Sequence, residues 1–281
     1  MLISKALSTL LRHQAENAGI RLDVEGYAPL DKVMQWQRLR SLNPTFDEIR
    51  QAVADNAKQR FAMKPKDPST TTTTQSDPAA WLIRANQGHS IALADEGLHT
   101  PVTLEAGGNV PDVVVHGTYF AFWPAIVASG GLKKMGRQHV HFGTGLLPQD
   151  DGEEEVGGKP KVVSGMRSDA EILVFMDVER SLKDGGIRWW ISANGVVLTD
   201  GNEDGVVPLK YFKEVRGRRQ GVGVLWRDGE KVADLPPDIV ARVPIGKGSG
   251  SGSGSGGAKK GRERGGGRGR GGKGKEGDRG K

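Results

Sequence analysis

Apolar side chains recur at helical spacing in the first part of the chain. In residues 3–13 they return every three or four positions, which predicts an amphipathic helix. Thr45, followed by Glu48 three residues later, is the pattern of a capping box, so a second helix is expected to begin there. Between them, residues 22–36 predict a short strand or turn that leads into another helix.

Two apolar runs, RFAM at 60–63 and WLIRA at 81–85, have the composition of β-strands. The segment between them, residues 64–80, is polar and rich in threonine, so we expect a loop insertion with no core-forming power. Helices followed by a β-hairpin predict a small winged-helix-like domain over residues 1–88, a shape often used to hold nucleic acid.

From about residue 110 the pattern changes to short strands with β-branched and aromatic side chains. The strand-like segments are VVVHGTYF, HVHF, EILVFMDV, WWISANGVVLTD and VPLKYF. One helix is expected at residues 122–129, stopped by Gly130 and Gly131. This pattern predicts a second domain over residues 89–246 and an α+β class for the chain. The sequence has neither a Walker loop nor a GxGxxG fingerprint.

The segment RQHVHF places Arg137, His139 and His141 at alternate positions. On a β-strand these three side chains share one face, while Val140 and Phe142 point to the other. An exposed polar strand face is one interpretation, and a phosphate or pyrophosphate site is another, because guanidinium and imidazole both suit such oxygens. A zinc site would need further ligands, and the chain has no cysteine and only four other histidines.

The positive charge is concentrated at the end of the chain. The formal net charge is +6, but residues 247–281 hold eleven Lys or Arg and three Asp or Glu, which leaves a net charge of −2 for residues 1–246. A Gly/Ser/Arg/Lys composition cannot bury a core, so a disordered tail is expected over residues 247–281. Arginines spaced by glycine favour loose RNA binding, and a solubilising role is the alternative.

Composition also narrows the class of protein. No run approaches the roughly 20 apolar residues that a membrane-spanning helix needs. The absence of cysteine excludes disulfides and thiol catalysis and fits a reducing compartment. A soluble intracellular protein, cytoplasmic or nuclear and without a membrane partner, is therefore expected.

Six sequence blocks then carry a resemblance. They are ISKALSTLLRH (3–13), NAKQRFAM (56–63), IRANQGHS (83–90), HGT (116–118), GLKKMGRQHVHF (131–142) and SANGVVLTDGNEDGVVP (192–208). In this order and spacing the chain closely resembles the RNA 2′-phosphotransferase family over residues 1 to about 215. The resemblance implies an N-terminal winged-helix-like RNA lobe and a C-terminal ADP-ribosyltransferase-like lobe that binds NAD.

The resemblance also implies roles for particular residues. A phosphate-handling set of three guanidiniums and one imidazole would be catalytic without any metal: Arg12, His13, Arg60 and Arg137. The implied NAD contacts are His116, Gly117, Thr118, His139, His141, Ser192, Asn194 and Gly195. The pattern does not choose between His139 and His141, since both point the same way. The implied RNA contacts are Arg84, Asn86, Gln87 and His89, with a polar interdomain linker as the alternative.

The implied reaction removes the splice-junction 2′-phosphate of tRNA in two steps. The 2′-phosphate first attacks the NAD ribose and expels nicotinamide. A ribose hydroxyl then attacks phosphorus, which frees the RNA 2′-hydroxyl and leaves ADP-ribose 1″,2″-cyclic phosphate. The expected partner is RNA with an internal 2′-phosphate, and the expected state is a monomer. Two alternatives stay open, an ADP-ribosyltransferase that acts on phosphate ends or protein, and a non-catalytic RNA-binding protein.

Overall fold

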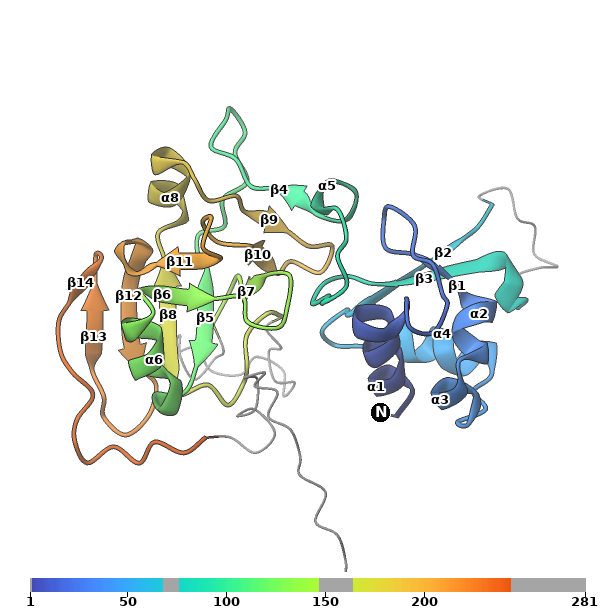
Figure 1. Cartoon of the computed structure of the whole chain (residues 1–281), viewed down its shortest axis with the longest axis horizontal. Helices are drawn as coiled ribbons and strands as arrows, with labels where there is room; N and C mark the ends of the chain where they lie inside the picture. The colour runs from blue at the N-terminus through green and yellow to red at the C-terminus, as the bar shows by residue number, and fades with distance from the viewer. Residues whose placement is uncertain (1, 68–75, 147–163, 244–281) are drawn as a thin grey trace, which may run out of the picture. The chain divides into compact units, whose positions relative to one another are not determined.

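The computed structural model describes residues 2–67, 76–146 and 164–243 as a mixed α/β chain with several small antiparallel sheets (Figure 1). This is consistent with the expected α+β class. The tail predicted for residues 247–281 lies outside the described residues. No helix in the described ranges is long and apolar enough to cross a membrane.

The N-terminal part begins with helices. They are α1 (Leu2–Thr9), a π-helical turn (Leu10–Gln14), α2 (Leu30–Gln35), α3 (Gln37–Arg40) and α4 (Phe46–Ala54). The first helix was predicted as one regular element, but its last turn widens from α to π geometry. That turn contains Arg12 and His13. Such π turns are rare and are frequent at functional sites.

The capping box at the start of α4 is confirmed. The Thr45 hydroxyl accepts a hydrogen bond from the Glu48 amide at 3.2 Å, and the Glu48 carboxylate accepts one from the Thr45 amide at 2.7 Å. Two otherwise orphaned amides are satisfied in this way, so the local sequence alone determines where α4 begins.

The predicted hairpin is also confirmed. Strand β2 (Phe61–Pro65) pairs with β3 (Trp81–Ala85), and β1 (Ala28–Pro29) completes a three-stranded sheet in the order β1-β3-β2. The register pairs the last residue of β2 with Trp81. The polar insertion predicted for residues 64–80 was therefore drawn too long, because its first two residues belong to β2.

The rest of the described chain forms three more sheets. Their orders are β4-β9-β10-β7, β11-β6 and β14-β13-β12-β8-β5. The strands are β4 (Thr100–Pro101), β5 (Val115–Thr118), β6 (Gly131–Lys133), β7 (Val140–Phe142), β8 (Ile172–Met176), β9 (Trp190–Ile191), β10 (Val197–Thr199), β11 (Val206–Pro208), β12 (Phe212–Gly217), β13 (Val224–Arg227) and β14 (Glu230–Lys231). A bridge between Val115 and Gly143 connects β5 with the end of β7.

The helices among these strands are short. They are the 3-10 turns η3 (Pro78–Ala80), η4 (Phe120–Phe122) and η5 (Leu209–Tyr211), and the α-helices α5 (Asp95–Leu98), α6 (Trp123–Ala128) and α8 (Val178–Asp184). The helix predicted at 122–129 is thus confirmed as α6. Gly130 follows at a φ of 76°, a conformation that favours glycine and ends the helix.

The described core consists of separate hydrophobic clusters. One gathers buried residues between Ala6 and Ile91, and the largest gathers buried residues between Val102 and Trp226. No side chain belongs to both, so each cluster has its own set of helices and sheets around it.

The strand predicted for the RQHVHF segment is shorter than expected. Arg137 lies in the turn before β7, and only His141 of the three cationic positions is in the strand itself. The half-buried pattern was also wrong, because His139 and His141 are as buried as Val140 and Phe142. Both sides of β7 are covered by protein, so the two imidazoles have different neighbours.

Candidate active site

Arg12 is held in the π-helical turn with its guanidinium largely inside the protein. Its Nε and Nη2 atoms are buried and have no hydrogen-bond partner among the described residues. The guanidinium packs against Gly88, where even a Cβ would lie 3.4 Å from Cζ. Burial, and then the charges of Arg137 and Arg60, lower the Arg12 pKa to about 10. Arg12 therefore stays charged at neutral pH, with unused donors for an anion.

His13, the next residue, has an exposed ring anchored at one side. Its Nδ1 lies 2.9 Å from the Ser90 hydroxyl, which leaves Nε2 for another group. Desolvation and then the charges of Arg12 and Arg137 lower the His13 pKa. The backbone reinforces this arrangement, because the Ser90 amide donates to the Arg12 carbonyl at 2.9 Å.

Arg60 directly precedes β2 and is half-buried. Its Nη1 donates to the Asn56 side-chain oxygen at 3.4 Å, and its carbonyl accepts from the Asn86 amide at 2.9 Å. Lys58, which sequence reasoning missed, lies two residues earlier. Burial, and then the charge of Arg60, lower the Lys58 pKa. The signal was present, since Lys58 is part of the block NAKQRFAM that carries Arg60.

Arg137 and Arg167 are two further cations, and they belong to the part of the chain that forms the larger hydrophobic cluster. Desolvation and then Arg167 lower the Arg137 pKa, so the two guanidiniums lie within electrostatic reach. Arg167 also lies over the Tyr119 ring, 5.4 Å from its centroid. Arg167 lies 30 residues after Arg137 in the sequence, and the folded chain brings the two guanidiniums together.

His116 and His141 form a neutral imidazole pair. The Nδ1 of His116 donates to the His141 carbonyl at 2.9 Å, which fixes that tautomer and leaves Nε2 as an acceptor. Burial, with smaller effects from Arg167 and Arg137, lowers the His116 pKa to about 4. Burial and then Arg137 also keep the His141 pKa well below its usual range, and its Nε2 has no partner among the described residues.

His139 has a different environment. Its Nε2 lies 3.0 Å and 3.2 Å from the two carboxylate oxygens of Asp95, and its ring packs edge-on against Trp190 and His99. The sequence pattern gave His139 and His141 the same direction, whereas in the structure His139 contacts a carboxylate and His141 lies near Arg137. The carboxylate beside His139 was not predicted.

Two glycine-containing turns complete the predicted NAD positions. A Cβ on Gly117 would lie 2.8 Å from the Ala170 Cβ, so glycine allows β5 to pack there, and Thr118 beside it is buried. The hairpin turn predicted around Asn194 and Gly195 is confirmed between β9 and β10, with Gly195 at a φ of 74°. Ser192 is buried and donates to the Asn194 side-chain oxygen at 2.8 Å.

The side-chain amide of Asn194 connects the β9–β10 turn with the segment before β2. Its Nδ2 donates to the Lys58 carbonyl at 2.8 Å, and the Ser164 hydroxyl donates to the same carbonyl at 3.2 Å. The Lys58 ammonium in turn donates to the Met166 carbonyl at 3.1 Å. These bonds fix the segment before Arg60 against the loop that carries Arg167.

The predicted RNA contacts are mostly inside the protein. Asn86, Gln87 and His89 are buried, and the Asn86 amide donates to the Gln59 carbonyl at 2.7 Å. Arg84 lies over the Tyr27 ring and donates to the Glu25 carbonyl at 3.0 Å. Burial and then Arg12 lower the pKa of His89 to about 3. Asn86, Gln87 and His89 therefore contribute little exposed surface to the candidate site.

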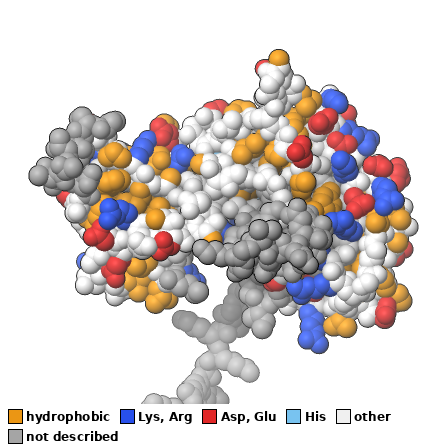
Figure 2. Space-filling view, turned by 180° about the vertical axis from the view of Figure 1, so that it is seen from behind, with side chains coloured by type: hydrophobic (Ala, Val, Ile, Leu, Met, Phe, Trp, Pro, Cys, Tyr) orange, Lys and Arg blue, Asp and Glu red, His pale blue; other side chains and the backbone are white. Residues whose placement is uncertain are grey.

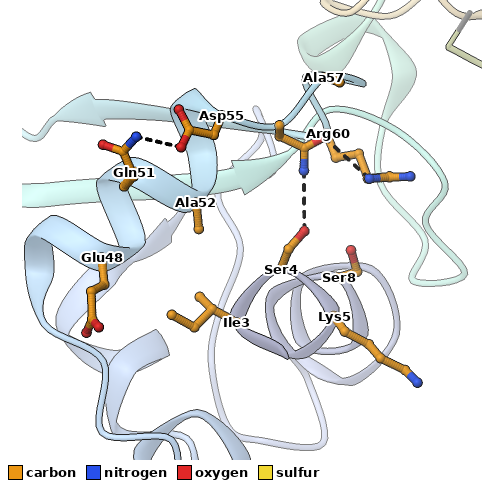
Figure 3. A pocket seen from close by; sticks show the side chains of 11 residues that line it. Ile3, Ser4, Lys5, Ser8, Glu48, Gln51, Ala52, Asp55, Ala57 and Arg60 are labelled. Carbon is orange, nitrogen blue, oxygen red and sulfur yellow. Dashed lines mark hydrogen bonds between the residues drawn. The ribbon is translucent and has the colours of Figure 1, made fainter. Parts of the chain in front are cut away.

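A pocket of about 800 Å³ lies beside Arg60, between α1 and α4 (Figure 3). Its lining mixes both charges: Ile3, Ser4, Lys5, Ser8, Glu48, Gln51, Ala52, Asp55, Asn56, Ala57 and Arg60. The carboxylates of Glu48 and Asp55 oppose a phosphate there. The pocket is therefore not the place where the cations would hold an anion.

The Lys and Arg side chains that form ion pairs in the described ranges are exposed ones. On the face seen in Figure 2, Lys and Arg side chains lie intermixed with Asp and Glu. Pairs such as Lys210–Asp184 at 2.9 Å and Arg227–Glu214 at 3.2 Å are typical. Within the described ranges, Arg12, Arg60 and Arg137 make no such pair.

Clustered guanidiniums without carboxylate partners suit stabilisation of the negative charge on a transferred phosphate group. Comparison with known proteins specifies the class of protein. A sequence model described as "RNA 2'-phosphotransferase, Tpt1 / KptA family" matches residues 1–201. The chain belongs to this family and is a transferase.

The relatives carry the same description. A tRNA 2′-phosphotransferase 1 of Bos taurus is 42% identical over 215 residues, which cover 75% of this chain and 73% of the relative. The Homo sapiens protein of that name is 41% identical over 212 residues, with 75% and 74% covered. The tRNA 2′-phosphotransferase of Saccharomyces cerevisiae is 30% identical over 213 residues, with 76% and 82% covered.

Proposed function

We infer that this chain removes an internal 2′-phosphate from RNA by transfer to NAD, with ligated tRNA as the substrate. The products are RNA with a free 2′-hydroxyl, nicotinamide and ADP-ribose 1″,2″-cyclic phosphate. The observation that carries this inference is Arg12, whose buried Nε and Nη2 have no hydrogen-bond partner among the described residues and whose guanidinium lies within electrostatic reach of Arg137 and Arg60. Family membership supports the reaction type.

Arg12 and Arg60 hold the 2′-phosphate in this proposal. Arg12 offers two buried donors that no described group uses, and a phosphate dianion accepts several charge-assisted hydrogen bonds at once. Each bond is stronger in a partly buried site than in water. Lys58, with its lowered pKa, adds positive charge beside Arg60.

His13 moves a proton in this proposal. Its Nδ1 is engaged with Ser90, so Nε2 is the atom that faces the substrate. The arginines lower its pKa, whereas a bound phosphate dianion would raise it. Substrate binding would therefore protonate His13 and prepare it to donate to the departing RNA oxygen.

The residues around β5 and β7 fit NAD. The His141 Nε2 has no partner among the described residues, and the His116 ring is held through its Nδ1, so both imidazoles suit contacts with ribose hydroxyls. Arg137 and Arg167 suit the pyrophosphate or the transferred phosphate. NAD, when bound, supplies the ADP-ribose group that accepts the phosphate. Gly117, Thr118, Ser192, Asn194 and Gly195 shape the turns around it.

In this proposal RNA and NAD bind to different parts of the chain, which correspond to the two largest hydrophobic clusters. We assign RNA binding to a winged-helix-like lobe over residues 1–88 and NAD binding to an ADP-ribosyltransferase-like lobe over residues 89–246. The cations come from both parts of one chain, so a single chain is sufficient as the working unit. The buried Asn86, Gln87 and His89, together with Arg84, position the RNA-binding cations in this proposal.

A defined oligoribonucleotide tests the proposal. It carries one internal 2′-phosphate and is incubated with the full chain, with or without NAD, and the products are separated on a gel. Loss of phosphate only with NAD, together with release of the cyclic phosphate, supports the proposal. Modification of a terminal-phosphate oligonucleotide instead would identify an ADP-ribosyltransferase, and binding without turnover would identify an RNA-binding protein.

A further inference from the structure

Three potential metal ligands, Asp95, His99 and His139, lie close together near the start of β7. Asp95 is the first residue of α5, His99 directly follows α5, and His139 directly precedes β7. One ligand atom from each lies within 4.8 Å of the other two. His139 and His99 are almost completely buried, so this is an enclosed group and not an exposed acidic patch.

The distances match the spacing that a metal imposes. In a tetrahedral site with bonds of about 2.0–2.2 Å, neighbouring ligand atoms lie roughly 3.3–3.5 Å apart. The Asp95 Oδ1 lies 3.0 Å from the His139 Nε2 and 3.8 Å from the His99 Nε2. Both distances lie within about half an ångström of that spacing.

The hydrogen bonding leaves the central oxygen unsatisfied. The Asp95 Oδ1 makes no hydrogen bond with any described residue, even though it is the carboxylate oxygen nearer to His139. The His89 Nε2 is also buried and has no partner among the described residues. A buried carboxylate oxygen without a partner is costly, so it indicates a missing cation or water.

The chemistry of the three ligand atoms also suits a metal. Two imidazole nitrogens and one carboxylate oxygen are a donor set that Zn²⁺ accepts, with water in the fourth position.

We propose that Asp95, His99 and His139 form a binding site for one Zn²⁺-class transition-metal ion. This differs from the absence of metal expected from sequence, and it does not depend on the proposed reaction. Its role is positional. The ion would fix His139, which directly precedes β7 and lies two residues from both Arg137 and His141, to the segment that contains α5.

Cobalt titration tests the site directly. The full chain, purified without a histidine tag and stripped with a chelator, is titrated with Co²⁺ and followed by visible absorption, then challenged with Zn²⁺. We expect one Co²⁺ per chain with a low-coordinate ligand-field spectrum, displaced by Zn²⁺ because Zn²⁺ binds such ligands more tightly. No absorption at one equivalent would show that the trio is only a hydrogen-bonded cluster.

Variants then locate the ion. His99→Gln and Asp95→Asn should weaken Co²⁺ binding by about 100-fold or more, since losing even an outer partner of a ligating histidine costs about 10–100-fold. Glu96→Gln, which neutralises the exposed carboxylate next to Asp95, is the matched control and should bind like the parent. Equal affinity in His99→Gln would overturn the assignment.

Two further measurements guard against misfolding. His99→Cys keeps a ligand at the same position and should retain Zn²⁺ binding, which a merely structural histidine would not predict. Zn²⁺ should also raise the Tm of the parent and of Glu96→Gln but not that of His99→Gln. A Zn²⁺-induced rise of equal size in His99→Gln would contradict the proposal.

Discussion

Two histidines two residues apart lie in opposite electrostatic environments. His139 faces the Asp95 carboxylate and the ring of His99, whereas burial, and then the charge of Arg137, hold the His141 pKa well below its usual range. One region of the molecule is built around a carboxylate and the other excludes it. The difference shows that two residues of the same type need not have the same function. The charged groups around each imidazole determine what it can bind.

The same comparison separates cations that serve stability from cations that serve a ligand. Exposed pairs such as Arg227–Glu214 contribute about 0–1 kcal/mol to folding. Arg12 has lost part of its hydration and gained no described counter-charge, so its position works against the stability of the free protein. Such an arrangement is understandable only if an anion binds there.

The largest effect is expected when a guanidinium of the proposed phosphate-binding set is removed. Arg12→Ala and Arg60→Ala should each lower 2′-phosphate removal by about 10²–10³-fold, a loss of about 2.7–4 kcal/mol of transition-state stabilisation. Turnover of the 2′-phosphorylated oligonucleotide measures this loss. Arg21→Ala removes an exposed arginine and should match the parent. Near-parental turnover of Arg12→Ala would exclude Arg12 from the site.

Replacement of Arg137 should distinguish the two steps. Arg137 is electrostatically coupled to Arg167 and precedes the β7 strand, so we expect it to stabilise the phosphate from the NAD side. In Arg137→Ala, RNA that carries ADP-ribose on its 2′-phosphate should accumulate on a gel. Arg137→Lys should rescue only in part, because a point charge replaces a two-pronged donor.

Two controls keep that test specific. Arg219→Ala, which removes an exposed arginine of a turn, should show no accumulation. If Arg137→Ala consumes substrate slowly without any build-up, then Arg137 acts in binding or in the first step.

A smaller effect is expected from the buried imidazole beside the arginines. The His116 pKa is lowered to about 4, so between pH 6.5 and 4 the unfolded chain binds more protons there than the folded chain. The stability contributed by neutral His116 is present above pH 6.5 and is lost as pH falls toward 4, by at most about 1.4 kcal/mol per pH unit.

Thermal unfolding of the parent and of His116→Gln between pH 7 and 4.5 measures this contribution. The Tm of the variant should fall less steeply with decreasing pH, whatever its absolute value at pH 7. Parallel curves would mean that His116 is protonated equally in both states.

The smallest effect is expected from the basic residues at 247–281, in contrast with the arginines of the candidate site. Truncation after residue 246 removes the Gly/Arg/Lys-rich segment and should leave turnover of a short substrate nearly unchanged. Affinity for long RNA at low salt should fall, because several phosphate contacts are lost, and the difference should vanish as salt rises. Filter binding at two salt concentrations measures it, and equal affinities at low salt would make the segment a bystander.

Local signals in the sequence were sufficient for several elements. The Thr45–Glu48 box located the start of α4, and Gly130 located the end of α6, because each depends on neighbouring residues only. The hairpin turn at Asn194 and Gly195 was predictable for the same reason. The RQHVHF segment was not, because its burial on both sides depends on distant strands.

The candidate site also contains residues that the sequence identified and residues that it did not. Arg12, Arg60 and Arg137 were identified from sequence blocks, although their functions stay predictions. Arg167 and Asp95 could not be found from spacing, since only the folded chain brings them to Arg137 and His139. The different surroundings of His139 and His141 are likewise a tertiary property that period-2 alternation does not contain.

The π-helical turn at Leu10–Gln14 makes the length of the first helix a constrained quantity. A π turn accommodates one residue more than the α-helical turn it replaces. Loss of one residue within Leu10–Gln14 would restore α geometry and remove the widened turn itself, which would change the directions of the side chains inside it. Arg12 would leave Gly88, and the Arg12 carbonyl would leave the Ser90 amide. We therefore expect natural variation here to proceed by substitution, with single-residue deletions in this turn strongly selected against.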